Sequence, residues 1–150
     1  LPDKKTFIYA GAAADPSCRN QRSLENRMRK KKEAGAKFIQ TQMVMERENL
    51  IEFCEKIANP LEIPVIAGVF LLKSYKNALF INRYVPGANI PENILQRLKD
   101  AKNPLEEGIQ IAVEQAQDFF CIANGIHLMA VKTEHLIPEI LEKANLNLEY

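Results

Sequence analysis

The feature that most constrains this chain is a strand-to-helix alternation that occurs four times within 150 residues. The strands are apolar runs, which we place at 6–14, 37–44, 64–72 and 126–131. Strands that alternate with helical patterns predict a parallel sheet, because a parallel pair needs a long crossover between its strands. We therefore expect an α/β fold of four βα units with parallel strands, which is half of a (βα)8 barrel of the TIM type.

The second strand differs from the other three in polarity. The other three are near-continuous apolar runs, as in strands buried on both faces, whereas the second carries Gln40, Thr41 and Gln42 together. Such groups need partners inside a protein, and core water or a ligand would supply them. An open doubly wound sheet is the alternative fold. The lack of a Gly-x-Gly-x-x-Gly motif after the first strand weighs against it.

Capping residues separate these strands from the helical patterns. The expected helix starts are Ser23, Asn49 with Glu52 as a capping box, Ser74, Pro91, Asn103 and a residue near Pro138. The third connection is the longest, because it holds an extra helix that starts at Pro91. Asn124 and Gly125 predict a left-handed end for the long helix that starts at Asn103.

Composition limits the range of functions. The net charge of +1 gives no electrostatic reason to expect nucleic-acid or membrane binding, and no run of about 18 apolar residues could span a bilayer. The three cysteines, Cys18, Cys54 and Cys121, follow no metal or disulfide spacing. We therefore expect a cytoplasmic protein without a metal site. The length suits a single domain over residues 1–150, and the start at Leu1 indicates a processed chain or a piece of a longer protein.

One helix carries a concentration of basic residues. Arg27, Arg29 and Lys30 to Lys32 lie on the helix that follows the loop at 14–16, with Arg19 and Arg22 just before it. A run of charges on a helix is usually a solvated face. The carboxyl ends of barrel strands are also where ligands bind, and bases there can hold a phosphate or pyrophosphate. Both interpretations stay open at this point.

Several segments, taken in order, resemble the second half of the methylenetetrahydrofolate reductase family. They are residues 11–16 (GAAADP), 32–42 (KEAGAKFIQTQ), 64–75 (PVIAGVFLLKSY), 85–92 (VPGANIPE), 104–109 (PLEEGI) and 125–129 (GIHLM). The resemblance covers nearly the whole chain. It implies a flavin enzyme on a (βα)8 barrel, which passes a hydride from NAD(P)H, or electrons from another donor, through FAD. The substrate of the family is 5,10-methylenetetrahydrofolate, which is reduced to 5-methyltetrahydrofolate in one-carbon metabolism.

The resemblance also implies roles for particular residues. Gln42 would hydrogen-bond the pterin of the folate, and Tyr75 would contact the folate or nicotinamide that stacks on the flavin. Lys31, with Arg27 one turn earlier, would contact FAD, and Asp15 lies in the loop that presents polar groups to the flavin. An amide suits the role given to Gln42, because one side chain both donates and accepts hydrogen bonds at a pterin edge.

The first half of the family's barrel, with its proposed acid for folate protonation, has no counterpart in these 150 residues. We therefore expect no catalytic residue in this part of the barrel and no activity from it alone. His127 lies within a strand and reads as a core histidine. A half barrel is expected to associate with itself or with the missing N-terminal half. A non-redox module that binds folate or another methyl carrier is the alternative function.

Overall fold

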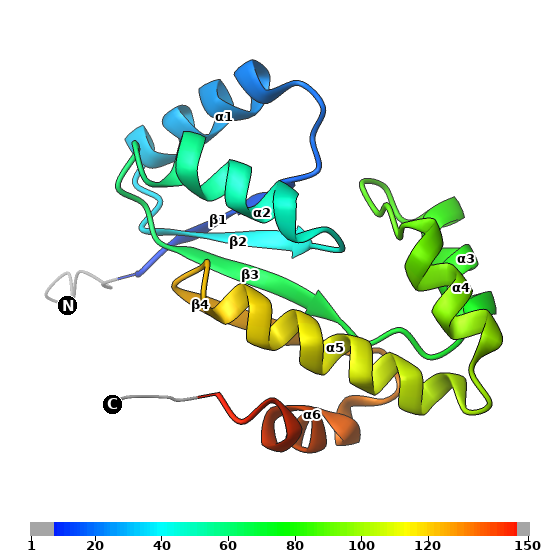
Figure 1. Ribbon diagram of the computed structural model, residues 1–150. Coiled ribbons are helices and arrows are strands. Elements are labelled where there is room, and N and C mark those ends of the chain that lie inside the picture. The colour runs from blue at the N-terminus through cyan, green and yellow to red at the C-terminus, as the bar shows by residue number, and fades with distance from the viewer. Residues whose placement is uncertain (1–7, 147–150) are drawn as a thin grey trace, which may run out of the picture.

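The computed structural model describes residues 8–146, which form one four-stranded sheet with helices packed against it (Figure 1). The strands are β1 (Gly11–Ala14), β2 (Phe38–Met43), β3 (Val65–Phe70) and β4 (Gly125–Met129). They pair in the order β1-β2-β3-β4, and every pair is parallel. The predicted α/β architecture of four βα units, half of a (βα)8 barrel, is therefore confirmed.

Helices fill each connection between the strands and follow the last strand. They are α1 (Gln21–Glu33), α2 (Arg47–Phe53) continued by the π-helix η1 (Cys54–Ala58), α3 (Tyr75–Tyr84), α4 (Glu92–Asp100), α5 (Pro104–Phe120), and α6 (Ile137–Ala144) preceded by the 3-10 turn η2 (Glu134–Leu136). The third connection holds three of them, as expected from its length. In Figure 1, the arrowheads mark the carboxyl ends of the strands, and α3 and α4 lie beyond those of β2 and β3.

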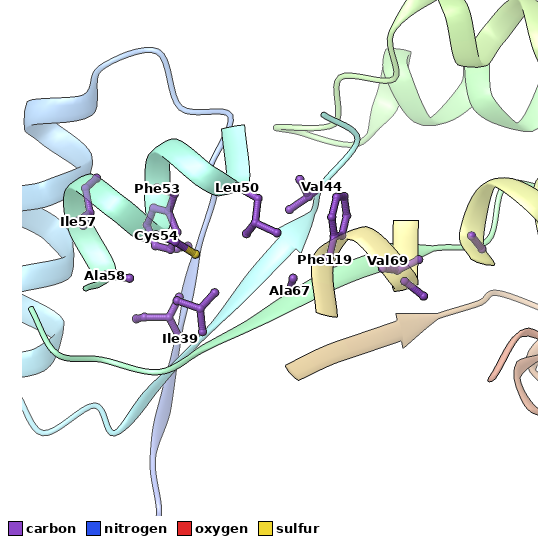
Figure 2. Close-up of a cluster of buried hydrophobic side chains, with 14 of the residues drawn as sticks. Ile39, Val44, Leu50, Phe53, Cys54, Ile57, Ala58, Ala67, Val69 and Phe119 are labelled. Carbon is purple, nitrogen blue, oxygen red and sulfur yellow. The ribbon is translucent and has the colours of Figure 1, made fainter. Parts of the chain in front are cut away.

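The main hydrophobic core lies between one face of the sheet and α1, α2, α5 and α6. Apolar residues recur at helical spacing along these helices, so each helix presents one apolar side to the sheet. Figure 2 shows Leu50, Phe53 and Ile57 of α2 and η1 in one cluster with Ile39, which lies on β2. All four side chains are almost completely buried. Burial of each such side chain contributes about 1.5–3 kcal/mol, which makes this layer the main source of stability.

A second hydrophobic cluster joins α3 and α4 to the carboxyl end of the sheet. It contains Met43, Met45, Leu72, Ala78, Ile81, Ile90, Ile94, Leu95, Leu98 and Ile111. The predicted extra helix after Pro91 is confirmed, and its buried residues are the predicted ones, Ile94, Leu95 and Leu98. Arg97 ties this helix to α5 through ion pairs with Glu107 and Glu114, each with a shortest separation of 2.7 Å. The carboxyl rim of β2 and β3 is therefore held in place from one side.

The opposite face of the sheet is only partly covered. On β2, Phe38, Gln40 and Gln42 are half-buried, while Ile39 and Thr41 between them are fully buried against the helices. The expectation that the apolar strands are buried on both faces is wrong for β1 and β4, where only Ala14 is fully buried, whereas β3 is buried at four of its six residues. The physical reason is that four strands cannot curl far enough to close on themselves.

The first strand is shorter than predicted. Only Gly11–Ala14 pairs with β2, in register with residues 38–41. Ile8 and Tyr9, which were expected within the strand, have exposed fractions of 74% and 66%. Residues 6 and 7 of the predicted strand lie outside the described residues.

Two of the predicted helix starts need correction. Asn20, rather than Ser23, caps α1, because its Oδ1 accepts a hydrogen bond from Ser23 N at 2.9 Å. The proposed capping box at Asn49 is wrong, since α2 begins at Arg47 and Asn49 lies inside it. Its Nδ2 donates to Glu46 Oε2 at 3.0 Å instead. In both cases a polar residue within the first turn was read as the cap.

Ser74 and Asn103 do cap α3 and α5 as predicted, since their side chains accept hydrogen bonds from Asn77 N and Glu106 N. The predicted end of α5 is wrong. The helix ends at Phe120, and Gly125 belongs to β4 without a positive φ. Asn124 instead forms two hydrogen bonds with the backbone of Val65. Its side-chain Oδ1 accepts from Val65 N, and its backbone N donates to Val65 O, each at 2.9 Å.

Candidate functional site

A cavity of about 660 Å³ lies over the partly covered face of the sheet, between β1, the side of α1 and β2. Its volume is within the range of about 300–1,000 Å³ that is typical of small-molecule sites. Its apolar lining includes Leu24, Met28, Phe38, Pro86 and Met129. Its polar lining consists of Asp15, Arg27, Lys31, Gln40, Thr41 and Gln42. The lining therefore has the mixture of apolar surface and a few polar groups that is typical of small-molecule sites.

Asp15 stands at the carboxyl end of β1, in the loop that leads to α1. Its Oδ1 accepts a hydrogen bond from Ser17 N at 2.9 Å, which turns the carboxylate back over its own loop. The segment after α3 approaches it closely: a Cβ on Gly87 would lie 2.9 Å from Asp15 Oδ2. Gly87 also has a φ of +80°, which L side chains rarely adopt. A glycine is therefore required where this segment closes on Asp15.

Arg27 and Lys31 form the basic side of the cavity. They are one turn apart on α1 and therefore share a face of the helix. Lys31 Nζ donates to the carbonyl of Ala13 at 2.5 Å, and Arg27 Nη2 lies 3.3 Å from Cys18 Sγ. Both contacts hold the cations next to β1 and its loop.

The other basic residues of α1 point elsewhere. Arg29 pairs with Glu25 at 2.6 Å, and Lys32 Nζ donates to the carbonyl of Leu61. Neither residue lines the cavity. The helical period therefore separates Arg27 and Lys31 from Arg29 and Lys32.

The polar side chains of β2 have different hydrogen-bond partners. Thr41 is buried, and its Oγ1 accepts from Gly68 N at 2.8 Å while it donates to Gln42 O at 2.7 Å. These bonds lie where the register between β2 and β3 shifts, between Gln40 and Met43. Gln42 Oε1 accepts from Met43 N at 3.2 Å. That arrangement uses the amide oxygen of Gln42, and the two N–H donors on Nε2 remain for a ligand.

Gln40 pairs with a residue from a distant part of the chain. Its Nε2 lies 2.8 Å from Nδ1 of His127 on β4, and both side chains are half-buried. The reading of His127 as a core histidine is therefore wrong, since it lies on the partly covered face. The period-two pattern of Phe38, Gln40 and Gln42 was a signal for this face, but the contact with β4 could not be read from either segment alone.

Tyr75 does not line the cavity. It is the first residue of α3, and it packs against the second hydrophobic cluster. Lys99 Nζ lies 5.9 Å from the centre of its ring, which is a cation–π distance. The structure therefore brings together four of the five predicted site residues, namely Asp15, Arg27, Lys31 and Gln42, and leaves Tyr75 apart.

The described residues offer little other reactive chemistry. Burial raises the pKa of the Cys54 thiol to about 11, helped by the charge of Glu55, so this cysteine is protonated and inert. Within residues 8–146, no group of three or more His, Cys, Asp or Glu side chains could hold a metal ion. Over the same range, no helix is long and apolar enough to cross a membrane.

The four parallel strands, each followed by a helix, place the chain in the (βα)8 class of folds. The family model for methylenetetrahydrofolate reductase matches residues 9–145. The chain belongs to the methylenetetrahydrofolate reductase family.

Relatives with known names agree with this assignment. Methylenetetrahydrofolate reductase 2 of Saccharomyces cerevisiae is 28% identical over 127 residues, which cover 79% of this chain and 21% of the yeast protein. Methylenetetrahydrofolate reductases 1 and 2 of Schizosaccharomyces pombe are 29% and 31% identical, and each match covers 77% of this chain and 20% of the relative. The chain therefore spans about a fifth of the length of these relatives.

A solved structure has the same fold. It is a protein from Clostridium thermocellum that is described as binding two copies of 5-methyl-5,6,7,8-tetrahydrofolic acid. The TM-score is 0.68 at 18% sequence identity, and the match covers 89% of this chain and 51% of that one. At 18% identity, this similarity shows a shared fold and nothing further.

Proposed function

We propose that this chain binds a reduced folate and a flavin in the cavity over β1 and β2. It would do so as part of a flavin-dependent oxidoreductase that reduces 5,10-methylenetetrahydrofolate to 5-methyltetrahydrofolate in the cytoplasm. The observation that carries the proposal is the convergence of Asp15, Arg27, Lys31 and Gln42 on one cavity. These residues come from β2, α1 and the loop after β1. Membership of the family supports a folate ligand of the one-carbon pathway.

The amide of Gln42 is the group best suited to the pterin. Its Oε1 is engaged by Met43 N, which fixes the side-chain orientation and leaves Nε2 to donate to a ring nitrogen or carbonyl. Phe38 and Met129 supply apolar surface in the same cavity, against which a planar ring can pack. Gln42 would therefore orient the folate rather than react with it.

The basic side of the cavity fits FAD. Arg27 and Lys31 are the cations that line it, and a pyrophosphate is the part of FAD that needs them. Asp15, across the cavity at the end of β1, can accept a hydrogen bond from a sugar or ribityl hydroxyl. When bound, the flavin supplies the redox chemistry, with NAD(P)H or another donor as the source of electrons. The residues of this chain bind and orient; we assign no catalytic acid to them, and we expect the chain alone to be inactive.

A second candidate function is a non-redox module that binds folate or another methyl carrier. The structural neighbour from Clostridium thermocellum favours it, because that protein is described by its binding of 5-methyltetrahydrofolate. The two functions differ in whether a flavin is needed. The free cysteines Cys18, Cys54 and Cys121 suit the reducing cytoplasm under either proposal.

The two functions are separated by measuring flavin and folate together. The purified protein is examined for flavin absorbance and is then titrated with 5-methyltetrahydrofolate by calorimetry. A bound flavin together with folate binding supports the oxidoreductase, and folate binding without flavin supports the binding module. Binding of neither ligand would overturn both proposals.

A further inference from the structure

We propose that Gln40 and His127 act as one recognition element that reads the edge of the ligand's heterocycle. The inference rests on the proposed function, since it concerns the same cavity. It gives a ligand-reading role to Gln40, which lines that cavity, and to His127, which contacts Gln40, and it specifies the chemical class of ring that they select. The class is a planar heterocycle with a lactam edge, in which a ring carbonyl lies next to a ring N–H.

The first observation is the position of the pair. Gln40 lies on β2 and His127 on β4, with β3 between them, and their side chains nevertheless meet at 2.8 Å. The residue of β3 that is in register with His127 is Gly68, which has no side chain to separate them. A Cβ on Gly68 would also lie 2.9 Å from Met129 Cε. Side chains of β4 therefore reach across β3 on this face because Gly68 leaves the space open.

The second observation is the distribution of protons in the pair. The nitrogen Nε2 of Gln40 can only donate a hydrogen bond, so Nδ1 of His127 accepts it and carries no proton. A neutral imidazole then has its proton on Nε2. Two groups remain unused by the pair: Oε1 of Gln40, which accepts, and Nε2–H of His127, which donates. An acceptor beside a donor is the complement of a lactam edge, whose N–H donates and whose carbonyl accepts.

The third observation is the surroundings of the pair. Gln40 lines the cavity together with Gln42, which is two residues further along β2 and therefore on the same face. Phe38 and Met129 line it as well, and they offer apolar surface for the plane of a ring. Gln42 supplies N–H donors at one position of this wall, Gln40 supplies an acceptor at another, and His127, bonded to Gln40, adds a donor next to it. Together they can hold a ring by more than one edge.

A purely structural role explains the pair less well. Both side chains are half-buried on the partly covered face, where water competes for the hydrogen bond. A bond of this kind contributes little to stability, and apolar side chains would cover the sheet as effectively. In a ligand cavity, the same pair has a clear use, because a fixed tautomer gives a fixed donor and acceptor.

The test uses the variants Gln40→Ala and His127→Ala, and their combination. His135→Ala is the matched control for the histidine, because His135 is exposed within η2 and is not a partner of Gln40. Gln110→Ala is the control for the amide, since Gln110 is exposed on α5. Thermal unfolding of each variant establishes that it folds, which is expected because the altered side chains are half-buried or exposed.

The ligands are 5-methyltetrahydrofolate and the matched pair folic acid and aminopterin, which carry an oxo or an amino group at the same ring position. We expect each single variant to bind 5-methyltetrahydrofolate about tenfold more weakly, the cost of one lost hydrogen bond to a ligand. The double variant should be little worse than either single one, because the pair acts as a unit. The unaltered protein should prefer folic acid to aminopterin, and the variants should lose this preference.

A second measurement does not depend on the variants. Nitrogen NMR of the imidazole of His127 should report the Nε2–H tautomer, and its signals should shift when 5-methyltetrahydrofolate is added. Unchanged affinity and unchanged preference in the variants, with no shift of the His127 signals, would overturn the inference and leave the proposed function standing. Absence of folate binding by the unaltered protein would overturn the proposed function and this inference with it.

Discussion

Gly108 of α5 lies directly against the carbonyl of Leu72, so closely that a Cβ on Gly108 would be 1.7 Å from the Leu72 oxygen. Leu72 follows β3 and leads into Ser74, the cap of α3. This contact therefore sets the path of the chain at the carboxyl rim, where α5 and the third strand meet. Only a glycine permits it, because any side chain would displace the backbone of one element or the other.

Replacing Gly108 by alanine should destabilise the protein. Glycine to alanine in the interior of a helix normally stabilises by about 1 kcal/mol. Here the added methyl meets a backbone carbonyl, and overpacking of this kind costs about 1–3 kcal/mol or more. Urea unfolding monitored by circular dichroism measures the change. Asp118→Ala, at an exposed position of the same helix, is the control and should be within about 0.5 kcal/mol of the unaltered protein. A Gly108→Ala variant of raised stability would contradict the close contact.

Gln42→Ala should weaken folate binding and leave the flavin content unchanged. The substitution removes the amide donors that line the cavity, and one hydrogen bond to a bound ligand is worth about 1 kcal/mol or more. The affinity for 5-methyltetrahydrofolate is measured by calorimetry, and flavin is measured by absorbance. Equal folate affinity in the variant and the unaltered protein would show that Gln42 has another role.

Lys31→Ala should reduce flavin retention, and Arg29→Ala should not. Lys31 lines the cavity, whereas Arg29 is paired with Glu25 on the exposed side of the same helix. Both substitutions remove one positive charge from α1, so they change the overall electrostatic potential alike. Flavin retained after gel filtration is compared between the two variants. Equal retention would count against the assignment of Lys31 and Arg27 to FAD.

The fold was predictable because its signals are local. An apolar run that ends before a cap, as at Ser74, and a cap that begins an apolar helical stripe, as at Asn103, depend on residues only a few positions apart. The errors at Asn20 and Arg47 arose where several capping residues stand close together, and the choice among them depends on the path of the preceding loop. The exposure of one sheet face was missed for a different reason. An apolar run is equally consistent with a closed barrel and with half of one.

The site was predictable only in part. Asp15 and Gln42 lie near one another because the carboxyl ends of parallel strands meet at one edge, whereas the roles of Arg27 and Lys31, on α1, were implied by the family resemblance. Tyr75 was placed by its position after β3, but the long third connection carries it to the second hydrophobic cluster. The pair of Gln40 and His127 joins residues 87 positions apart. No local pattern predicts such a contact, since it depends on the register of three strands and on Gly68 between them.

Acid should weaken the attachment of α4 to α5. The hydrogen bond from Arg97 holds the pKa of Glu114 below its ordinary value of 4.5, with a further contribution from Gln110. A carboxyl whose folded pKa is depressed stabilises the protein above its unfolded pKa and loses that effect as the pH falls through the folded pKa. Because both partners are partly exposed, the contribution at neutral pH is under about 1 kcal/mol.

The measurement is urea unfolding of the unaltered protein and of Glu114→Gln between pH 7 and pH 3. The variant should be slightly less stable at pH 7, and the difference should shrink as the pH falls below about 4.5, the ordinary carboxyl value. Glu48→Gln is the control, because Glu48 is exposed at the start of α2, away from this ion pair. A difference that persists unchanged at pH 3 would mean that Glu114 acts through packing instead of charge.

The chain by itself should associate into dimers or larger species. The sheet order leaves β1 and β4 as edges within the described residues, and an unpaired strand edge invites another strand. Two copies related by a two-fold axis could pair β1 of one with β4 of the other, which keeps every strand parallel and supplies the eight strands that a closed barrel needs. The same arrangement would cover the partly exposed face that carries Phe38 and Gln40. Any other half barrel with matching edge strands would compete for this surface.

Light scattering at micromolar concentration measures the association. Ile8→Lys should weaken it several-fold, because Ile8 precedes β1 and is 74% exposed, so a charge there opposes burial in an interface at this edge. Leu79→Lys is the matched control: Leu79 is an exposed apolar residue on α3, at a distance along the chain from either edge strand. The control should associate like the unaltered chain. A stable monomer at these concentrations would mean that the sheet is covered in some other way, and the edge-to-edge arrangement of two half barrels would then be wrong.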